Sequence, residues 1–343
     1  MSMNIEELGE FGLIERLKLI VTEKVTHNSQ TTHDATLLLG IGDDAAVWSL
    51  GNEIELFTTD TMVENVHFST ENSTWQDIGW KALAVNISDI AAMGGVPKYA
   101  AITLGLPPST QVESMIDLYK GIQECGLRYN TTIIGGDMVS SQTTFITIGL
   151  TGITSGPFLC RAAARTGDRI AVTGNLGSSS AGLRLINENL QLNLRDSKTL
   201  RQAHLRPQPR LQEGQTLLNL GVKTAMDVSD GLIADLAKLC LASAKCATVW
   251  SNALPIASEV WRTFPSESID LALSGGEDYE LLFTAPQEII DKVIKQLSIK
   301  VSIIGEILEG IPGKVTVVDK DNNHMNLNSE GWDHFQLWKP NIL

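Results

Sequence analysis

Short clusters of aspartate beside glycine, threonine or serine recur along this chain of 343 residues. They lie at residues 40–44, 58–61, 88–89, 135–137 and 227–231. Carboxylates that meet at close range repel one another, so we expect them to gather only where cations hold them. Mg²⁺ prefers hard oxygen ligands and completes its shell with water and substrate phosphates. The clusters therefore predict one site, built from distant segments, for magnesium-assisted phosphoryl transfer.

Each cluster taken alone also fits an ordinary turn, because Asp and Gly are common turn residues. Asp230, for example, could simply N-cap a helix that begins at Leu232. Recurrence at the ends of expected strands and helices, where loops converge, favours metal binding. The candidate ligands are Asp43, Asp44, Asp60, Asp89, Asp137, Asp227 and Asp230.

Familiar nucleotide motifs do not explain these clusters. Residues 40–45 match the dinucleotide spacing G-x-G-x-x-A, but two carboxylates occupy the turn and a strand-like segment follows, where that motif needs a helix N-terminus. No G-x-x-x-x-G-K-[ST] loop is present, and neither are the HRD and DFG signatures of protein kinases. Any nucleotide must be bound by a different scaffold.

Three further segments each allow two interpretations. His67 is a lone histidine that spacing alone assigns to a loop. Residues 274–280 place two glycines before three acids, which fits a hairpin turn or a close backbone approach to a ligand. Residues 331–335 are rich in aromatic rings, which fits a core contact or a stacking surface for a planar heterocycle.

Composition excludes several classes of protein. The formal charge is 26 − 40 = −14, which disfavours a nucleic-acid surface because phosphate backbones require clustered Lys and Arg. Four widely spaced cysteines without a CxxC pair indicate neither a zinc site nor a disulfide framework, and a reducing cytoplasm fits best. The acidic N-terminus is unlike a signal peptide, and the longest apolar runs are too short for a membrane span.

The chain is longer than one core usually supports, so we expect two domains. The first, residues 1–155, reads as α+β. Apolar residues at Leu8, Phe11, Ile14, Leu17 and Ile20 predict a leading helix over 7–22, followed by a polar loop at 26–34. A strand over 54–59 puts Asp60 at a strand end, and a helix over 78–93 puts Asp89 in its last turns. The other expected elements are a helix at 111–127 and strands at 99–104, 132–134 and 144–152.

The second domain, residues 156–343, reads as α/β. It begins with a buried strand over 167–174, and a glycine- and serine-rich phrase at 174–182 then opens a helix. Residues 187–203 are polar and read as irregular. The remaining expectations are helices at 211–220 and 232–241 and strands at 248–250, 279–284, 301–304 and 314–318.

Nine phrases spread over nearly the whole chain resemble a known family. They are GIGDDAAV, TTDTMVENVHF, WKALAVNISDIAAMGG, IIGGD, VTGNLGSSSAGL, HLRPQPR, AMDVSDGLIADL, LSGGEDYELLF and GWDHF. On these phrases the chain is similar to thiamine-monophosphate kinases, a branch of the aminoimidazole ribonucleotide synthetase-like superfamily. The resemblance implies ATP-dependent phosphorylation of thiamine monophosphate to thiamine diphosphate. It also implies that the α+β domain pairs with a second copy in a barrel-like dimer core, with the α/β domain over it.

The resemblance also assigns roles to residues. It implies magnesium-site roles for Asp44, Thr58, Thr59, Asp60, Asp89, Asp137, Asp227 and Asp230, with Asp43 matching the motif as well. ATP contacts would come from Tyr119, Gly136, Asp137, Arg161 and Ser229. The thiamine end would be held by His67, Glu277 and Trp332. The acceptor is a phosphate oxygen that is already deprotonated, so we expect no catalytic side chain, only positioning and electrostatics by residues and several Mg²⁺ ions.

The main alternative is another ATP-dependent synthetase or ligase of the same superfamily, which would phosphorylate an amide or formyl oxygen. The acidic clusters fit that chemistry equally well. The segments that favour the thiamine branch are Val66-His67-Phe68 and GWDHF. A non-catalytic nucleotide-binding module is the third possibility, and the intact acidic clusters disfavour it.

Overall fold

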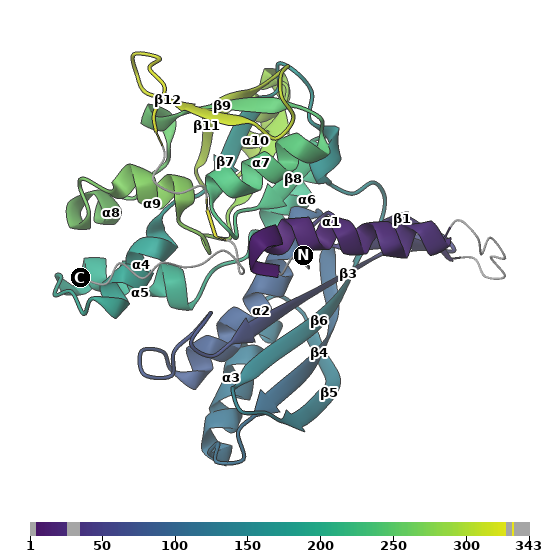
Figure 1. Ribbon diagram of the computed structural model, residues 1–343, viewed down its shortest axis with the longest axis vertical. Helices are drawn as coiled ribbons and strands as arrows, with labels where there is room; N and C mark the ends of the chain where they lie inside the picture. Colours follow the sequence, from purple (N-terminus) through teal and green to yellow (C-terminus); the bar gives the residue numbers. More distant parts are fainter. Residues whose placement is uncertain (1–4, 26–34, 327–330, 333–343) are drawn as a thin grey trace.

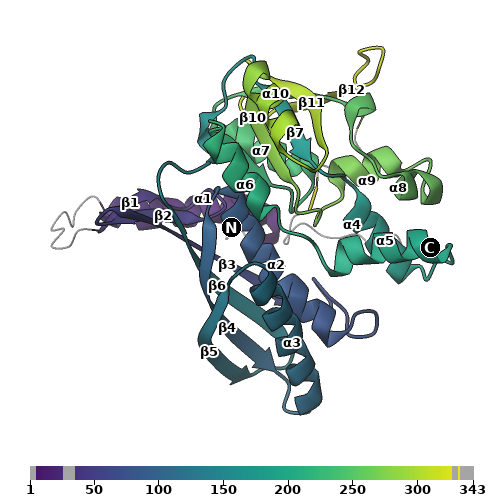
Figure 2. The same ribbon diagram turned by 180° about the vertical axis from the view of Figure 1, so that it is seen from behind.

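Two six-stranded sheets with flanking helices make up the computed structural model, which describes residues 5–25, 35–326 and 331–332. Figure 1 shows the first sheet with α2 and α3 at one end of the molecule and the second sheet with α7 and α10 at the other. Seen from behind, α2 and α6 lie where the two halves meet (Figure 2). Within the described residues, no helix combines the length and the hydropathy that crossing a bilayer requires.

The first sheet has the strand order β1-β2-β3-β6-β4-β5. Its strands are β1 (Ala35–Leu39), β2 (Ala46–Leu50), β3 (Glu53–Val63), β4 (Val96–Leu106), β5 (Thr132–Ser140) and β6 (Phe145–Thr154). All neighbours are antiparallel except β4 and β5, which are parallel and joined by the helix α3 (Val112–Arg128). Strict alternation of buried and half-buried residues in β6 shows that only one face of the sheet is covered.

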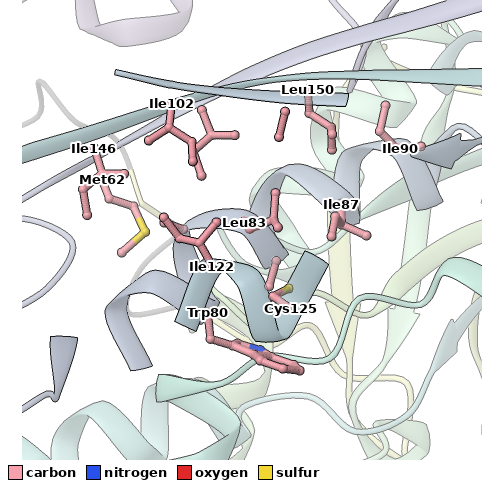
Figure 3. Packing of buried hydrophobic residues seen from close by; sticks show 14 of the residues in the cluster. Met62, Trp80, Leu83, Ile87, Ile90, Ile102, Ile122, Cys125, Ile146 and Leu150 are labelled. Atoms are coloured by element: carbon pink, nitrogen blue, oxygen red, sulfur yellow. The ribbon is translucent and has the colours of Figure 1, made fainter. Parts of the chain in front are cut away.

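That covered face packs on α2 (Trp75–Ala92), which is buried along most of its length. Thr74 caps the helix by accepting a hydrogen bond of 3.1 Å from the backbone N–H of Asp77. Small residues allow α2 and α3 to touch, because a Cβ at Gly79 would lie 2.0 Å from the carbonyl oxygen of Leu118. Figure 3 shows the resulting core, in which Leu83 and Ile87 of α2 pack between Ile122 and the sheet residue Leu150.

The second sheet has the strand order β12-β9-β11-β7-β10-β8. Its strands are β7 (Arg169–Thr173), β8 (Thr224–Asp227), β9 (Cys246–Trp250), β10 (Leu281–Ala285), β11 (Val301–Leu308) and β12 (Val315–Val318). Only the β12–β9 pair is parallel. Helices α6 (Leu211–Asn219), α7 (Leu232–Ala242) and α10 (Gln287–Gln296) supply residues to the apolar clusters on this sheet. A further group consists of α4 (Ser178–Asn187), α5 (Leu194–Leu205), α8 (Ser258–Thr263) and α9 (Ser268–Ser274).

Contacts along one side of α2 join the two halves. The indole N–H of Trp80 donates to the carbonyl oxygen of Pro207 at 2.9 Å, and the hydroxyl of Ser88 donates to Asp227 at 2.6 Å. One turn further on, a Cβ at Gly214 of α6 would lie 2.0 Å from the carbonyl oxygen of Ala91. The helix that carries Asp89 is therefore also the helix against which the second half packs.

Most expected elements are confirmed; the strand expected at 132–134 continues to Ser140 as β5, whereas the strand-end position of Asp60 and the irregular segment 187–203 are wrong. Asp60 lies within β3, not at its end, because antiparallel pairing with β6 continues to Val63. Gly136 lies inside β5, where the lack of a side chain allows close packing: a Cβ there would be 1.7 Å from the carbonyl oxygen of Ile102. The irregular segment 187–203 contains most of α5, whose N-cap Asn193 accepts from the backbone N–H of Asp196. Buried Leu200 anchors this otherwise polar helix.

The leading helix is confirmed as α1 (Ile5–Val25), with a kink at Gly9. Its expected apolar face is only partly used, because Leu17 and Ile20 are exposed. The polar segment expected at 26–34 lies outside the described residues.

Candidate active site

Three carboxylates from separate segments meet between the two sheets. Asp44 precedes β2, Asp89 lies in the last turn of α2, and Asp227 ends β8. One carboxylate oxygen from each lies within 4.8 Å of the others. The predicted convergence of distant acidic clusters is thus visible for these three residues.

Hydroxyl groups hold two of these carboxylates in place. Thr58 of β3 donates to Oδ2 of Asp89, and Ser88 of α2 donates to Oδ2 of Asp227. Asp60 lies on the same face of β3 as Thr58, since side chains two residues apart share a face. Its backbone N–H donates to Oδ1 of Asn86 at 3.1 Å. Asn86 is fully buried in α2 and was not predicted from the sequence.

The electrostatics of the cluster oppose ionisation. Burial, followed by the charges of Asp60, Asp227 and Asp44, raises the pKa of Asp89 well above its usual value. Burial, followed by Asp44, likewise raises the pKa of Asp227. The carboxylates repel one another in a space of low polarity, so a bound cation would relieve a real energetic cost.

A basic side chain meets the first acidic pair. The guanidinium of Arg161 bonds to Oδ1 of Asp44, and the backbone N–H of Arg161 donates to Asp43 at 3.0 Å. Burial, followed by the neighbouring charge of Asp44, nevertheless raises the pKa of Asp43 to about 6. Arg161, assigned to ATP by the resemblance, therefore contacts the predicted metal ligands directly. The rejection of a dinucleotide turn at residues 40–45 is confirmed, because β2 and not a helix follows.

The residues present fit a hard divalent cation. All donors are oxygens, as Mg²⁺ prefers. Oδ2 of Asp44 is buried and has no hydrogen-bond partner among the described residues. A buried acceptor without a donor is costly, and a metal ion bound beside the other two carboxylates would offset that cost.

The loop at residues 229–231 follows Asp227 and is held by a buried carboxylate. Oδ2 of Asp235, in the first turn of α7, accepts from the backbone N–H groups of Ser229, Asp230 and Gly231 at 2.9, 3.0 and 3.2 Å. Lys238 donates to the carboxylates of both Asp235 and Asp230. Asp230 does not cap α7 with its side chain, because Gly231 takes the N-cap position.

The predicted thiamine residues converge on the same loop. The backbone N–H of Glu277 donates to the carbonyl oxygen of Ser229 at 2.8 Å. The N–H of Trp332 donates to the next carbonyl oxygen, that of Asp230, at 3.1 Å, and the Trp332 side chain is 41% exposed. Burial raises the pKa of the Glu277 carboxyl, but the charges of Lys81, His204 and, to a smaller extent, His67 lower it more, so the net shift is downward. Residues 333–335 of the GWDHF phrase lie outside the described part of the chain.

Side chains that the sequence did not single out connect these groups. Glu277 pairs with Lys81 and His204, which come from α2 and α5. Burial, then the charges of Glu277, Asp60 and the acidic cluster, raises the pKa of Tyr279 well above its usual value. Tyr279 has a φ of +50° and Glu277 one of +65°, a left-handed backbone typical of functional loops. Hydrophobic periodicity in the sequence does not identify Lys81, His204 or Tyr279 as residues of the site.

Two predicted ligands lie on the opposite face of the first sheet. Thr59 alternates with Thr58 along β3 and is exposed on the face away from α2. Asp137 is paired with Thr103 in β5, and that row continues through Thr147 to Thr61 of β3. Three strand spacings amount to about 14 Å, so within one chain Asp137 is distant from the carboxylate trio.

Tyr119 is also separate from the trio. It follows Leu118, whose carbonyl oxygen lies beside Gly79 in the first half of α2. Ten residues of helix separate Gly79 from Asp89, which corresponds to about 15 Å along the axis. One chain does not bring Tyr119, Asp137 or Thr59 to the trio, and the roles assigned to all of the predicted site residues stay predictions.

Comparison with known proteins gives this geometry a context. The family model for the N-terminal domain of AIR synthase related proteins matches residues 42–154, and the model for their C-terminal domain matches residues 165–318. The predicted two-domain α+β and α/β fold is confirmed by these matches and by the structural neighbour below.

Relatives of known name align over nearly the full length. The thiamine-monophosphate kinase of Bacillus subtilis (strain 168) is 36% identical over 316 residues, covering 90% of this chain and 96% of the relative. That of Haemophilus influenzae is 37% identical over 342 residues, covering 96% and 98%. A solved structure described as AaThiL complexed with AMPPCP and TMP has a TM-score of 0.84 and 34% identity, covering 97% of this chain and 99% of the other. On this similarity, the chain belongs to the thiamine-monophosphate kinase family, within the AIR synthase related proteins.

Proposed function

We propose that this protein transfers the γ-phosphate of ATP to the phosphate of thiamine monophosphate and releases thiamine diphosphate and ADP. The observation that carries the proposal is the carboxylate trio of Asp44, Asp89 and Asp227, with one buried oxygen unpartnered among the described residues. The trio joins the loop at 229–231, whose carbonyl groups bind the backbone of Glu277 and Trp332. In this proposal, the phosphate site and the heterocycle site would share one loop. The family's solved complex with AMPPCP and TMP supports the same pairing of ligands.

The metal-binding role belongs to the acidic residues around that trio. Asp44, Asp89 and Asp227, with Asp43, Thr58 and Asp60 beside them, would hold Mg²⁺, and Asp230 would extend the site along the loop. The bound ions would supply the positive charge that offsets repulsion between two anionic substrates. Thr59 and Asp137 are also proposed as metal ligands, although within one chain they lie on the opposite face of the sheet from the trio.

The remaining residues bind and orient the substrates. Arg161 and the backbone of Ser229 lie beside the trio, where they can contact phosphate oxygens of ATP, with Gly136, Asp137 and Tyr119 as further ATP contacts. Trp332 offers a ring face to a thiamine heterocycle, while His67 and Glu277 offer polar groups. The attacking phosphate oxygen is already deprotonated at neutral pH, so no side chain has to act as a base.

A second copy of the chain completes this proposal. The face of the first sheet that α2 leaves uncovered carries exposed Phe57 and Tyr99, and the edge strand β5 is exposed along nearly its whole length. Pairing of this face with its counterpart would bury the apolar side chains and surround Asp137 with protein. We therefore propose a homodimer.

The domains would divide near residue 155, between β6 and β7. Four free cysteines fit an enzyme of the reducing cytoplasm.

The test is product analysis with purified protein, ATP, MgCl₂ and thiamine monophosphate. We expect thiamine diphosphate and ADP in equal amounts, and neither product when unphosphorylated thiamine replaces the monophosphate. The superfamily alternative, an ATP-dependent synthetase, predicts turnover only with an amide- or formyl-bearing nucleotide. ADP formed at the same rate without thiamine monophosphate would reject the proposed acceptor.

A further inference from the structure

The carboxylate of Glu277 is held by two buried side chains from distant elements. Nζ of Lys81 lies 2.6 Å from Oε1, and Nδ1 of His204 lies 3.3 Å from Oε2. The side chains of Lys81 and His204 are 4% and 7% exposed, whereas that of Glu277 is 26% exposed. Each carboxylate oxygen of Glu277 therefore has one buried partner. Of the three side chains, only that of Glu277 is appreciably exposed to solvent.

These contacts reach across the molecule. Lys81 belongs to α2, which also carries Ser88 and Asp89 of the metal-binding region, and His204 belongs to α5. The hydroxyl of Ser179, at the start of α4, lies 3.2 Å from Nδ1 of His204. The carboxylate therefore has a position fixed by three helices, although Glu277 itself lies in a loop.

The loop around Glu277 is fixed at each neighbouring acid as well. Asp278 accepts from the backbone N–H groups of Gly177 and Ser179 at 2.7 and 3.1 Å. Glu280 accepts from both Nε and Nη2 of Arg210, at 2.6 and 2.5 Å. With Glu277 in a left-handed conformation, the backbone alone would not select this geometry. The surrounding contacts select it.

Burying a lysine and a histidine around a carboxylate is a poor way to gain stability. Desolvation of such charges usually cancels much of their attraction, and apolar side chains would fill the same space at lower cost. The presence of this network at the proposed thiamine site is better explained by the position it gives to the carboxylate of Glu277, the one group that would reach the ligand.

We propose that Lys81 and His204 are positioning residues that hold the carboxylate of Glu277, ionised and correctly directed, for the heterocyclic end of thiamine monophosphate. This inference rests on the proposed function and extends it to two residues outside the predicted site. Burial, followed by the charge of Lys81, lowers the pKa of His204 to about 3, so the ring is neutral at pH 7, and with its proton on Nδ1 it would donate to the carboxylate oxygen 3.3 Å away. Each carboxylate oxygen keeps a second lone pair, which can accept a donor group of the ligand.

The test is steady-state kinetics of Lys81→Met and of two His204 variants. Lys81→Met keeps the length of the side chain but removes the charge, and we expect the KM for thiamine monophosphate to rise at least tenfold while the KM for ATP changes less than twofold. His204→Leu removes the donor and should raise the same KM about fivefold or more. His204→Asn places an amide nitrogen where Nδ1 lies, so it should restore a near-normal KM.

A double variant shows whether Lys81 acts through Glu277. If it does, Lys81→Met combined with Glu277→Gln should bind thiamine monophosphate no more weakly than Glu277→Gln alone. Lys120→Met is the matched control, because Lys120 is an exposed lysine paired with Asp117 on α3, and its KM values should equal those of the wild type. Thermal unfolding of each variant separates loss of fold from loss of binding, and the two His204 variants provide the test if Lys81→Met does not fold.

Three results would overturn the positioning role. They are an unchanged KM for thiamine monophosphate in both Lys81→Met and His204→Leu, an equal rise in the KM for ATP, and effects of Lys81→Met and Glu277→Gln that simply multiply. Wild-type protein that forms no thiamine diphosphate would instead reject the proposed function, and the positioning role would fall with it. Turnover by the wild type with unaltered variants would reject the positioning role alone.

Discussion

Replacing Asp89 by Asn tests whether the acidic cluster is a cation site, because it removes one charge and little volume. The carboxylate oxygens of Asp44, Asp89 and Asp227 lie within 4.8 Å of one another. Two unit charges at that separation repel by about 3.5 kcal/mol at an effective dielectric constant of 20. Asp89 faces two such neighbours, so its ionised form opposes folding of the metal-free chain.

We therefore expect Asp89→Asn to make the metal-free chain more stable and to make the enzyme less active. In EDTA at pH 7, its free energy of unfolding should be about 1–3 kcal/mol higher than that of the wild type, because part of the repulsion is lost. In MgCl₂ at 100 times its dissociation constant, the wild type should gain about 2.7 kcal/mol. The variant should gain far less, and its rate of thiamine diphosphate formation should fall at least a hundredfold.

Urea unfolding in EDTA and in MgCl₂, followed by circular dichroism, measures both stability effects, and product analysis measures the rate. Asp117→Asn is the matched control, because Asp117 is exposed on α3 and paired with Lys120. It should leave the magnesium dependence and the activity unchanged. The reasoning fails if Asp89→Asn gains as much stability from Mg²⁺ as the wild type, or if it is less stable in EDTA and fully active.

Two further predictions concern the supporting structure. Burial raises the pKa of Asp278 from its usual value near 4 to about 7, so the folded state retains a proton that the unfolded state releases. Its contribution to the free energy of unfolding should then fall by about 1.4 kcal/mol per pH unit between pH 4 and 7, and urea titrations of Asp278→Asn should lack this slope. Gly136→Ala should lower the free energy of unfolding by about 1–3 kcal/mol in the same assay, because the added Cβ would lie 1.7 Å from the carbonyl oxygen of Ile102.

Each of these two predictions has its own control. His204 contributes the opposite slope, since its lowered folded pKa makes stability rise with pH between about 3 and 6.5, so the Asp278 measurement should be repeated in a His204→Asn background. An unchanged slope in Asp278→Asn would contradict the assignment. Gly156→Ala is the comparison for Gly136, because a Cβ at Gly156 meets nothing within 4 Å. Equal stability of the two alanine variants would show that β4 and β5 do not need the glycine.

The sequence predicted helices well where apolar residues recur with helical spacing, as for α2 and α3. The prediction failed where a contact with a distant segment determines whether an element forms or how far it extends. The polar α5 needs Leu200 and His204 to be buried, and its own composition gives no sign of that. The strand β5 continues through two glycines because β4 lies beside it. In both places the stabilising partner is distant in the chain, so local pattern could not reveal the element.

For the site, the sequence by itself determined the chemistry: many oxygen donors beside turn residues, few clustered cations, and phrases similar to one kinase family. Only the tertiary structure decided which donors meet. Asp44, Asp89 and Asp227 come together because β2 begins, and α2 and β8 end, at one place between the sheets, whereas Thr59 is turned away from its neighbour Thr58 by strand alternation. Lys81 and His204 lie in two of the phrases that carry the resemblance, but their pairing with Glu277 could not be read from the sequence, because only tertiary packing brings α2, α5 and the loop of Glu277 together.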